Sequence, residues 1–251
     1  MWKNNEIVNL DANTLMSLVN NQVAGVKIAD FASSEEIEGF TRALTGQSCR
    51  TQSVKQVTRL GISQYEQGVC NSKQAYFDRA KEVSESFNEI FEQSFSPRAR
   101  FIECLRKIGI DAAVMHEPGY GDYFAGNGKL RNGLSPIHVD FAPQDSADWL
   151  IGSSKAQLAW NFYLQVPNEG GELLLWDKFW QPADDVYQVE GSYFYDEKVV
   201  EGCPLLKVKV SPGEVVIINA RNFHAVAESK DRLAFGSFIS VFDDDTYRLW
   251  S

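Results

Sequence analysis

Cysteine and histidine are scarce in this sequence, which has four cysteines and three histidines among 251 residues. The cysteines are Cys49, Cys70, Cys104 and Cys203. They are widely spaced and no two of them form a Cys-x-x-Cys pair, so the sequence predicts neither a zinc knuckle nor a disulfide framework. We expect them to be ordinary buried or reduced thiols.

A long apolar run is also absent, and so is an excess of basic charge. The chain passes from Met1 through Glu6 to Asp11 without an apolar stretch, so we expect neither a signal peptide nor a membrane-spanning helix and predict a cytoplasmic location. With 34 acidic and 24 basic residues the net charge is −10. This balance argues against nucleic acid as a partner, because phosphates attract basic patches.

The composition that remains is that of a globular protein. At 44% hydrophobic and 23% charged residues the chain can bury a sizeable core, and its length suits a single domain over residues 1–251. We expect about residues 1–110 to form a helix-rich part, which packs on a core made by about residues 111–242.

Helical signals are concentrated in the N-terminal part. A β-branched segment at 23–29 predicts a strand that leads into a helix, and Ser33-x-x-Glu36 is a capping box for that helix. Apolar residues recur at helical spacing over about 73–93 and again over 98–108, which predicts two further helices. We interpret their aromatic stripe as core.

From about residue 111 the helical periodicity gives way to short apolar runs separated by turn residues. The runs are 112–115, 157–166, 172–176, 205–210, 215–219 and 233–242. Because no helices lie between them, they predict an antiparallel sandwich or barrel, and hence a mainly β fold with helices flanking one sheet. An aromatic and acidic insertion at about 177–202 is expected either to cover a site or to pack as a local cluster.

Two of the three histidines belong to one pattern, His138-Val139-Asp140 followed far downstream by His224. Side chains that flank one residue in an extended segment point the same way, so His138 and Asp140 can take adjacent positions on a metal. Two imidazoles and a carboxylate on one face leave the opposite positions open, as in non-haem Fe(II) oxygenases. His-x-Asp alone is common, however, and His224 could equally be a hydrogen-bonded core histidine.

The surroundings of this pattern resemble the Fe(II)- and 2-oxoglutarate-dependent dioxygenases with a double-stranded β-helix (jelly-roll) fold. The resemblance covers about residues 111–242 and keeps the family's motif order. Residues 159–173 are similar to the strand, Gly-Gly turn and strand of prolyl-4-hydroxylase-like members, and 212–218 resembles the strand before the distal ligand. We interpret the Gly-Gly pair as a hairpin turn. The resemblance implies that the two histidines and the aspartate bind Fe(II).

Arg232 follows His224 on the next expected strand. The family uses such an arginine to hold the distal carboxylate of 2-oxoglutarate, since a planar guanidinium can form two parallel hydrogen bonds with a carboxylate. The usual pattern has a serine two residues after the arginine, whereas Ser237 stands further along, which leaves the second carboxylate contact open. Surface pairing of Arg232 with Asp231 or Glu228 is the structural alternative.

Further contacts are expected on the strand that should cross the barrel. Asn161 and Tyr163 share a parity, so they face the same side, and either could hydrogen-bond 2-oxoglutarate if that side is the inner one. Trp160 on the same strand is a candidate substrate contact.

Three other residues are candidate substrate contacts. Arg131 precedes the iron motif and Arg221 precedes the distal histidine, so each could bind an anionic substrate group. His116 stands at the end of an apolar run, before a loop. Surface cations and a solvated histidine are the structural alternatives.

The resemblance implies Fe(II), 2-oxoglutarate and O2 as cofactors, and oxidation of an unactivated C–H bond with release of succinate and CO2. The layout, including the closing residues 247–251, also resembles halogenases that act on free indole alkaloids, in which a small residue replaces the carboxylate and leaves a position for chloride. Because Asp140 is present here, hydroxylation, desaturation or ring closure is favoured over halogenation. Hydroxylases of free or N-substituted amino acids are a further resemblance.

We therefore expect a small-molecule substrate, either an amino-acid derivative or a secondary metabolite. One alternative is a hydroxylase of protein or peptide side chains, which an open groove would favour. Another is a metal-binding jelly-roll module without catalytic activity.

Overall fold

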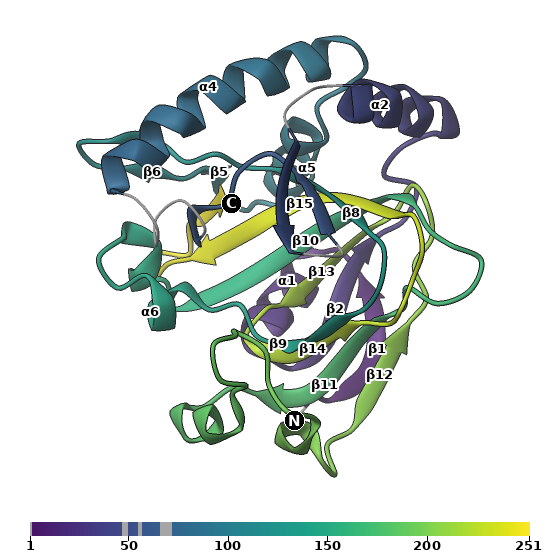
Figure 1. Ribbon diagram of the computed structural model, residues 1–251, viewed down its shortest axis with the longest axis vertical. Helices are drawn as coiled ribbons and strands as arrows, with labels where there is room; N and C mark the ends of the chain where they lie inside the picture. The colour runs from purple at the N-terminus through teal and green to yellow at the C-terminus, as the bar shows by residue number, and fades with distance from the viewer. Residues whose placement is uncertain (1, 47–49, 55–56, 66–71) are drawn as a thin grey trace.

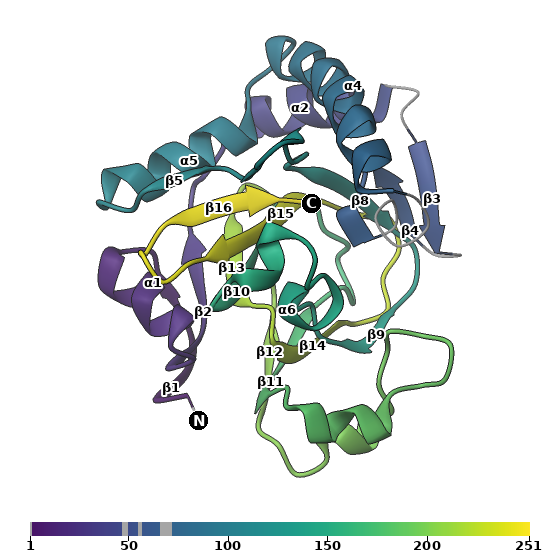
Figure 2. The ribbon, with the colours of Figure 1, turned by 90° about the vertical axis from the view of Figure 1, so that its left-hand side faces the viewer.

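Two facing β-sheets with helices on one side make up the fold (Figure 1). The computed structural model describes residues 2–46, 50–54, 57–65 and 72–251. Most of the helices lie on the outer face of the larger sheet, and the smaller sheet faces its inner side (Figure 2). This arrangement is the predicted double-stranded β-helix with flanking helices.

Among the described residues the larger sheet runs through eight strands in order, and a ninth strand attached at β15 carries a tenth. The order is β1 (Asn4–Asn9), β2 (Val23–Ile28), β13 (Val215–Asn219), β10 (Ala156–Gln165), β15 (Arg232–Val241), β8 (Asn127–Arg131), β4 (Val57–Leu60) and β3 (Arg50–Val54). In addition to its pairing with β8, β15 pairs with β16 (Tyr247–Trp250), and β16 pairs with β5 (Ala112–Val114). The pairing is antiparallel except for β1 with β2 and β5 with β16.

The smaller sheet has the order β12 (Leu205–Val208), β11 (Leu173–Phe179), β14 (Asn222–Val226) and β9 (Ser135–His138). A short ladder joins β6 (His116–Glu117) to β7 (Gly121–Asp122). The helices are α1 (Ala12–Val19), α2 (Ser34–Gly46), α4 (Lys73–Glu92), α5 (Pro97–Lys107) and α6 (Ala142–Asp145), with 3-10 turns η1 (Leu150–Ser153), η2 (Pro182–Tyr187) and η3 (Glu197–Val200).

Alternation along β10 separates the hydrophobic core from the interior between the sheets. Leu158, Trp160 and Phe162 belong to the cluster that joins the larger sheet to the helices. Trp160 stacks on Phe101 of α5 with ring centroids 4.3 Å apart. Ala159 and Tyr163, at the alternate positions of the strand, belong to a second cluster, which is shared with the smaller sheet. Every second side chain of β10 therefore points into the space where a site can form.

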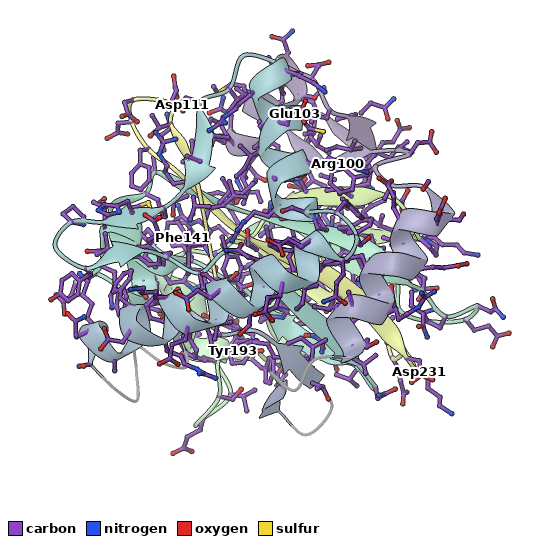
Figure 3. All side chains as sticks on the ribbon, turned by 90° about the horizontal axis from the view of Figure 1, so that it is seen from above. Arg100, Glu103, Asp111, Phe141, Tyr193 and Asp231 are labelled. Carbon is purple, nitrogen blue, oxygen red and sulfur yellow. The ribbon has the colours of Figure 1, made fainter. Side chains whose placement is uncertain are left out.

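The predicted helices form at the expected places, and their caps follow the sequence signals. The Ser33 N–H donates to Glu36, and the Glu36 N–H donates back to the Ser33 hydroxyl, as the capping box requires. Arg100 of α5, labelled in Figure 3, forms an ion pair of 2.5 Å with Glu36 and so ties α5 to α2. The aromatic residues of α4, including Tyr76 and Phe87, are buried in the core as predicted.

The first 110 residues also supply strands. The predicted strand at 23–29 is β2, and β1, β3 and β4 extend the same sheet. Within the described residues no helix is long and apolar enough to cross a membrane. Cys104 and Cys203 are free thiols, whereas Cys49 and Cys70 lie outside the described residues.

Candidate metal and cosubstrate site

His138, Asp140 and His224 meet between the two sheets. His138 ends β9, His224 lies in the middle of β14, and the register of these antiparallel strands makes the two histidines direct partners. The Oδ2 atom of Asp140 lies 3.3 Å from Nε2 of His224 and 3.8 Å from Nε2 of His138. One ligand atom from each of the three residues lies within 4.8 Å of the other two.

The hydrogen bonds of the imidazoles are made by their Nδ1 atoms, and their Nε2 atoms face Asp140. Nδ1 of His138 lies 2.8 Å from the Pro136 carbonyl oxygen, and Nδ1 of His224 lies 2.9 Å from that of Asn222. Because a carbonyl oxygen only accepts, each Nδ1 carries a proton and donates it. Burial, followed by the neighbouring His224, lowers the pKa of His138 to about 3, so this ring is neutral at ordinary pH.

Nε2 of each imidazole and a carboxylate oxygen of Asp140 therefore converge. Two imidazole nitrogens and a carboxylate are a donor set that suits a divalent metal such as Fe(II). The histidines are 9% and 6% exposed, whereas Asp140 keeps an accessible side. The residues present thus fit a metal with open positions toward the cavity.

Arg232 is the first residue of β15 and is 5% exposed, which excludes the surface pairing with Asp231 or Glu228. Its Nε donates to the carbonyl oxygen of Gly171 at 3.1 Å. Gly171 has φ +74°, and a Cβ there would lie 3.2 Å from Cδ of Arg232. Glycine is therefore favoured at this position both by the backbone conformation and by the close approach of the arginine.

The hairpin interpretation of the Gly-Gly turn is wrong. The turn joins β10 of the larger sheet to β11 of the smaller one, and these two strands pair with other partners. It is a crossing between sheets, and the carbonyl group of Gly171 positions the arginine that lies at the inner end of the cavity.

Tyr163 and Asn161 both face the inside, which settles the parity that the sequence left open. The guanidinium carbon of Arg232 lies 5.0 Å from the ring centroid of Tyr163. The Tyr163 hydroxyl is buried and has no hydrogen-bond partner of ordinary geometry among the described residues, although it lies near enough to the Arg232 guanidinium to interact with it. A buried hydroxyl without a partner beside a buried guanidinium is what a carboxylate ligand would satisfy, so the residues fit 2-oxoglutarate as well.

Ser237 and Trp160 lie on the opposite face of the sheet from Arg232. The Trp160 indole donates to the Ser237 hydroxyl at 2.7 Å, and both side chains pack toward the helices. Both residues are nevertheless among those that line the cavity. The ring of Trp160 stacks on Phe101 in the core, so its role as a substrate contact stays a prediction.

A cavity of about 310 Å³ contains the triad, Arg232, Asn161 and Tyr163. Arg131 also lines it, and its role as a substrate contact stays a prediction. Arg221 does not, because its guanidinium stacks on Phe179 and its Nε donates to the Trp180 carbonyl. His116 is exposed and pairs with Asp122 at 2.8 Å, away from the cavity. These two predictions are corrected, because the side chains of Arg221 and His116 point away from the cavity.

Lys129 is a residue of the cavity wall that the sequence reasoning missed. It lies two positions before Arg131 on β8, on the same face of the strand. The available signal was the alternation Lys-Leu-Arg on a strand, which was not identified because β8 lacks β-branched residues.

The insertion at about 177–202 has two roles, one for each predicted alternative. Tyr193 and Phe194 pack on the His138 ring with centroids 5.6 and 6.1 Å away, and both line the cavity. Trp180, Tyr195 and Val199 instead form a local hydrophobic cluster. Figure 3 labels Tyr193 of the covering part and Phe141, another residue of the cavity wall.

The fold and this site define a 2-oxoglutarate-dependent non-haem iron oxygenase. The chain belongs to the family of the carrier-protein-independent halogenase WelO5, which it matches over residues 4–251. It is 36% identical over 194 residues to the leucinostatins biosynthesis cluster protein S of Purpureocillium lilacinum, an alignment that covers 72% of this chain and 77% of that protein.

Two other similarities are more limited. The L-gamma-glutamyl-L-propargylglycine hydroxylase of Streptantibioticus cattleyicolor is 32% identical over 99 residues, which cover 38% of this chain and 36% of that enzyme. The structure of an N-substituted L-amino acid dioxygenase from Burkholderia ambifaria, in complex with alpha-ketoglutarate, superimposes with a TM-score of 0.66 at 14% identity. That superposition covers 96% of this chain and 91% of the other and supports the same fold.

Proposed function

We propose that this protein hydroxylates an unactivated C–H bond of a small molecule, an amino-acid derivative or secondary metabolite, with release of succinate and CO2. Fe(II) is bound by His138, Asp140 and His224. Arg232 binds the distal carboxylate of 2-oxoglutarate, with Tyr163 and Asn161 beside it. The observation that carries this proposal is the convergence of two imidazole nitrogens and a carboxylate oxygen in the same cavity as a buried arginine and a buried tyrosine hydroxyl.

Asp140 favours hydroxylation over halogenation. Its carboxylate oxygen lies within 3.8 Å of both histidine Nε2 atoms, so it takes the position that chloride would need on a metal held there. Its negative charge also repels a halide. The family membership therefore supports the iron and cosubstrate chemistry, while this residue supports a different outcome from the halogenation in the family's name.

The chain's own residues hold the metal and the cosubstrate, orient them and exclude water from the cavity. Bound Fe(II) and 2-oxoglutarate supply the oxidising chemistry with O2. The carbonyl groups of Pro136 and Asn222 fix the two imidazole rings, and the Gly171 carbonyl fixes Arg232. Tyr193 and Phe194 shield the His138 side of the cavity from solvent.

The size of the cavity favours a small molecule over the side chain of an intact protein. A volume of about 310 Å³ lies at the small end of ordinary ligand pockets. The hydroxylase similar to part of this chain acts, by its name, on a dipeptide-like amino acid, and the longer relative belongs to a biosynthetic cluster. Both support a substrate from amino-acid or secondary metabolism.

Anaerobic titration of the apoprotein with Fe(II) and 2-oxoglutarate tests the proposal. We expect a weak visible charge-transfer band that requires both additions. A His224→Ala variant, which lacks one donor of the triad, should show no band at the same concentrations. Tight metal binding without the band in the natural protein would overturn the assignment of the cosubstrate.

A further inference from the structure

The cavity wall formed by β4, β8 and β15 carries four cations in two facing pairs. Arg59 of β4 is the direct cross-strand partner of Lys129, and Arg232 of β15 is the direct partner of Arg131. Lys129 and Arg131 are two positions apart on β8, so all four side chains share one face of the sheet. All four line the cavity.

Such a wall is unfavourable unless anions neutralise it. Like charges directly opposite each other on paired strands destabilise a sheet. Burial, followed by the neighbouring Arg59, lowers the pKa of Lys129 to about 8, and burial, followed by Arg232, lowers the pKa of Arg131 to about 10. The protein as a whole carries a net charge of −10, so a cluster of this sign departs from the character of the chain.

Carboxylates of the described residues do not pair with the two β8 cations of this wall, Lys129 and Arg131. Of the acidic residues that line the cavity, Asp140 belongs to the triad and Asp145 lies exposed at its rim. Among the described side chains, neither Lys129 nor Arg131 forms an ion pair with a carboxylate. Lys129 lies 5.7 Å from the ring centroid of Phe238, and Arg131 donates only a long hydrogen bond of 3.4 Å to the Leu134 carbonyl.

The cosubstrate would neutralise only part of the charge. A divalent metal and Arg232 together balance Asp140 and the two carboxylates of 2-oxoglutarate. The remaining cations of β8 still face the cavity, where a buried charge is costly unless it is paired. A second anion beside Lys129 and Arg131 would offset part of this remaining charge.

We infer that the substrate carries a carboxylate group and that Lys129 and Arg131 bind it. The inference rests on the proposed function and adds the substrate class and its anchoring residues. The planar guanidinium of Arg131 can hold both carboxylate oxygens, and the Lys129 ammonium adds a compact third donor. Lys129, Arg131 and the metal ligands line one small cavity, so the oxidised carbon and the bound carboxylate belong to the same small molecule.

Calorimetric titration of the full chain, loaded anaerobically with Fe(II) and saturating 2-oxoglutarate, tests this inference. The probes are two matched pairs, N-acetyl-L-leucine with N-acetyl-L-leucinamide and hexanoate with hexanamide. Each pair differs in charge but hardly in shape. We expect the carboxylates to bind roughly 10- to 100-fold more tightly than the amides, as charge-assisted hydrogen bonds predict.

Variants assign that preference to the two cations. Lys129→Met and Arg131→Met should each reduce carboxylate affinity by about 10-fold and leave amide affinity unchanged. Lys129→Arg, which keeps the charge, should retain most of the preference. Lys207→Met removes a lysine from exposed β12, outside the cavity, and should leave the preference intact.

Three results would overturn the inference. One is equal affinity for acids and amides, and another is no binding of either acid at about 10 mM. The third is a loss of 2-oxoglutarate affinity in the β8 variants as large as the loss of probe affinity, which would assign both cations to the cosubstrate. The charge-transfer band, recorded before each titration, separates these results from failure of the proposed function, which its absence would indicate.

Discussion

His138 and His224 are direct cross-strand partners, and their ring centroids lie 4.2 Å apart. This relationship places two residues that are distant in sequence on one short ladder of the smaller sheet. Asp140 continues past the end of β9, where its N–H donates to the Ala220 carbonyl at 2.9 Å. The metal site is thus set by the register of two strands and by one hydrogen bond beyond it.

Replacing Asp140 by glycine should weaken Fe(II) binding by roughly 10- to 100-fold and open a position for chloride. Chelator competition measures the affinity. Chloride should then shift the visible band of the Fe(II) and 2-oxoglutarate complex in the variant and not in the natural protein. Asp140→Asn, which keeps the volume but not the charge, is the control. A chloride shift in the natural protein would contradict the argument that the carboxylate fills this position.

Replacing Arg232 by alanine should raise the dissociation constant of 2-oxoglutarate by roughly 100-fold, since it removes one partner of a buried charged pair. Iron affinity should change little, because the guanidinium does not touch the triad. Arg221→Met is a matched control, since that arginine lies outside the cavity. If the control weakens 2-oxoglutarate binding as much, the carboxylate contact has been assigned to the wrong arginine.

Replacing Glu36 by glutamine should destabilise the protein in a pH-dependent way. The hydrogen bond from Arg100 is the main reason that the pKa of Glu36 falls from 4.5 to about 2. A lowered folded pKa stabilises the fold above the unfolded value, and this stabilisation is lost as pH falls through the folded one. Because the side chain is one-third exposed, we expect a difference of only about 1 kcal/mol at pH 7.

That difference should shrink steadily between pH 4.5 and pH 2, as measured by urea unfolding of both proteins. Glu35→Gln removes the same charge from the adjacent position of α2 and should show no such trend. A constant difference across this range would mean that the pair with Arg100 does not stabilise the contact between α2 and α5.

Periodicity and motif order made the fold class and the metal triad predictable from the sequence. Helices α4 and α5 repeat apolar residues every third or fourth position, and β13 and β15 are apolar runs bounded by turns. The triad and Arg232 were predictable because each stands in a recognisable motif. In those cases local pattern and global fold agree.

The features that the sequence did not reveal depend on which way a side chain points or on which strands pair. β9 is four residues long and contains Pro136, and β8 carries Lys129 and Arg131 on its inner face. A strand with charges facing an internal cavity inverts the usual pattern of apolar residues inside, so periodicity does not reveal it. The partners of β10 and β11 likewise follow from sheet topology, which is why the Gly-Gly turn was mistaken for a hairpin.

Replacing Tyr163 by phenylalanine should change stability and cosubstrate affinity in opposite directions. In the apoprotein the hydroxyl is buried without a partner, so its removal should raise the free energy of unfolding by about 1 kcal/mol. If that hydroxyl donates to a carboxylate of 2-oxoglutarate, the same change should weaken cosubstrate binding by roughly 5- to 10-fold. Urea unfolding and calorimetry measure the two effects.

Tyr247 offers a matched control for this change. Its hydroxyl is also buried without a partner among the described residues, but it does not line the cavity. Tyr247→Phe should therefore stabilise the apoprotein by a similar amount and leave 2-oxoglutarate affinity unchanged. If both variants stabilise the protein and neither weakens cosubstrate binding, the Tyr163 hydroxyl does not contact 2-oxoglutarate, and Arg232 binds the distal carboxylate without it.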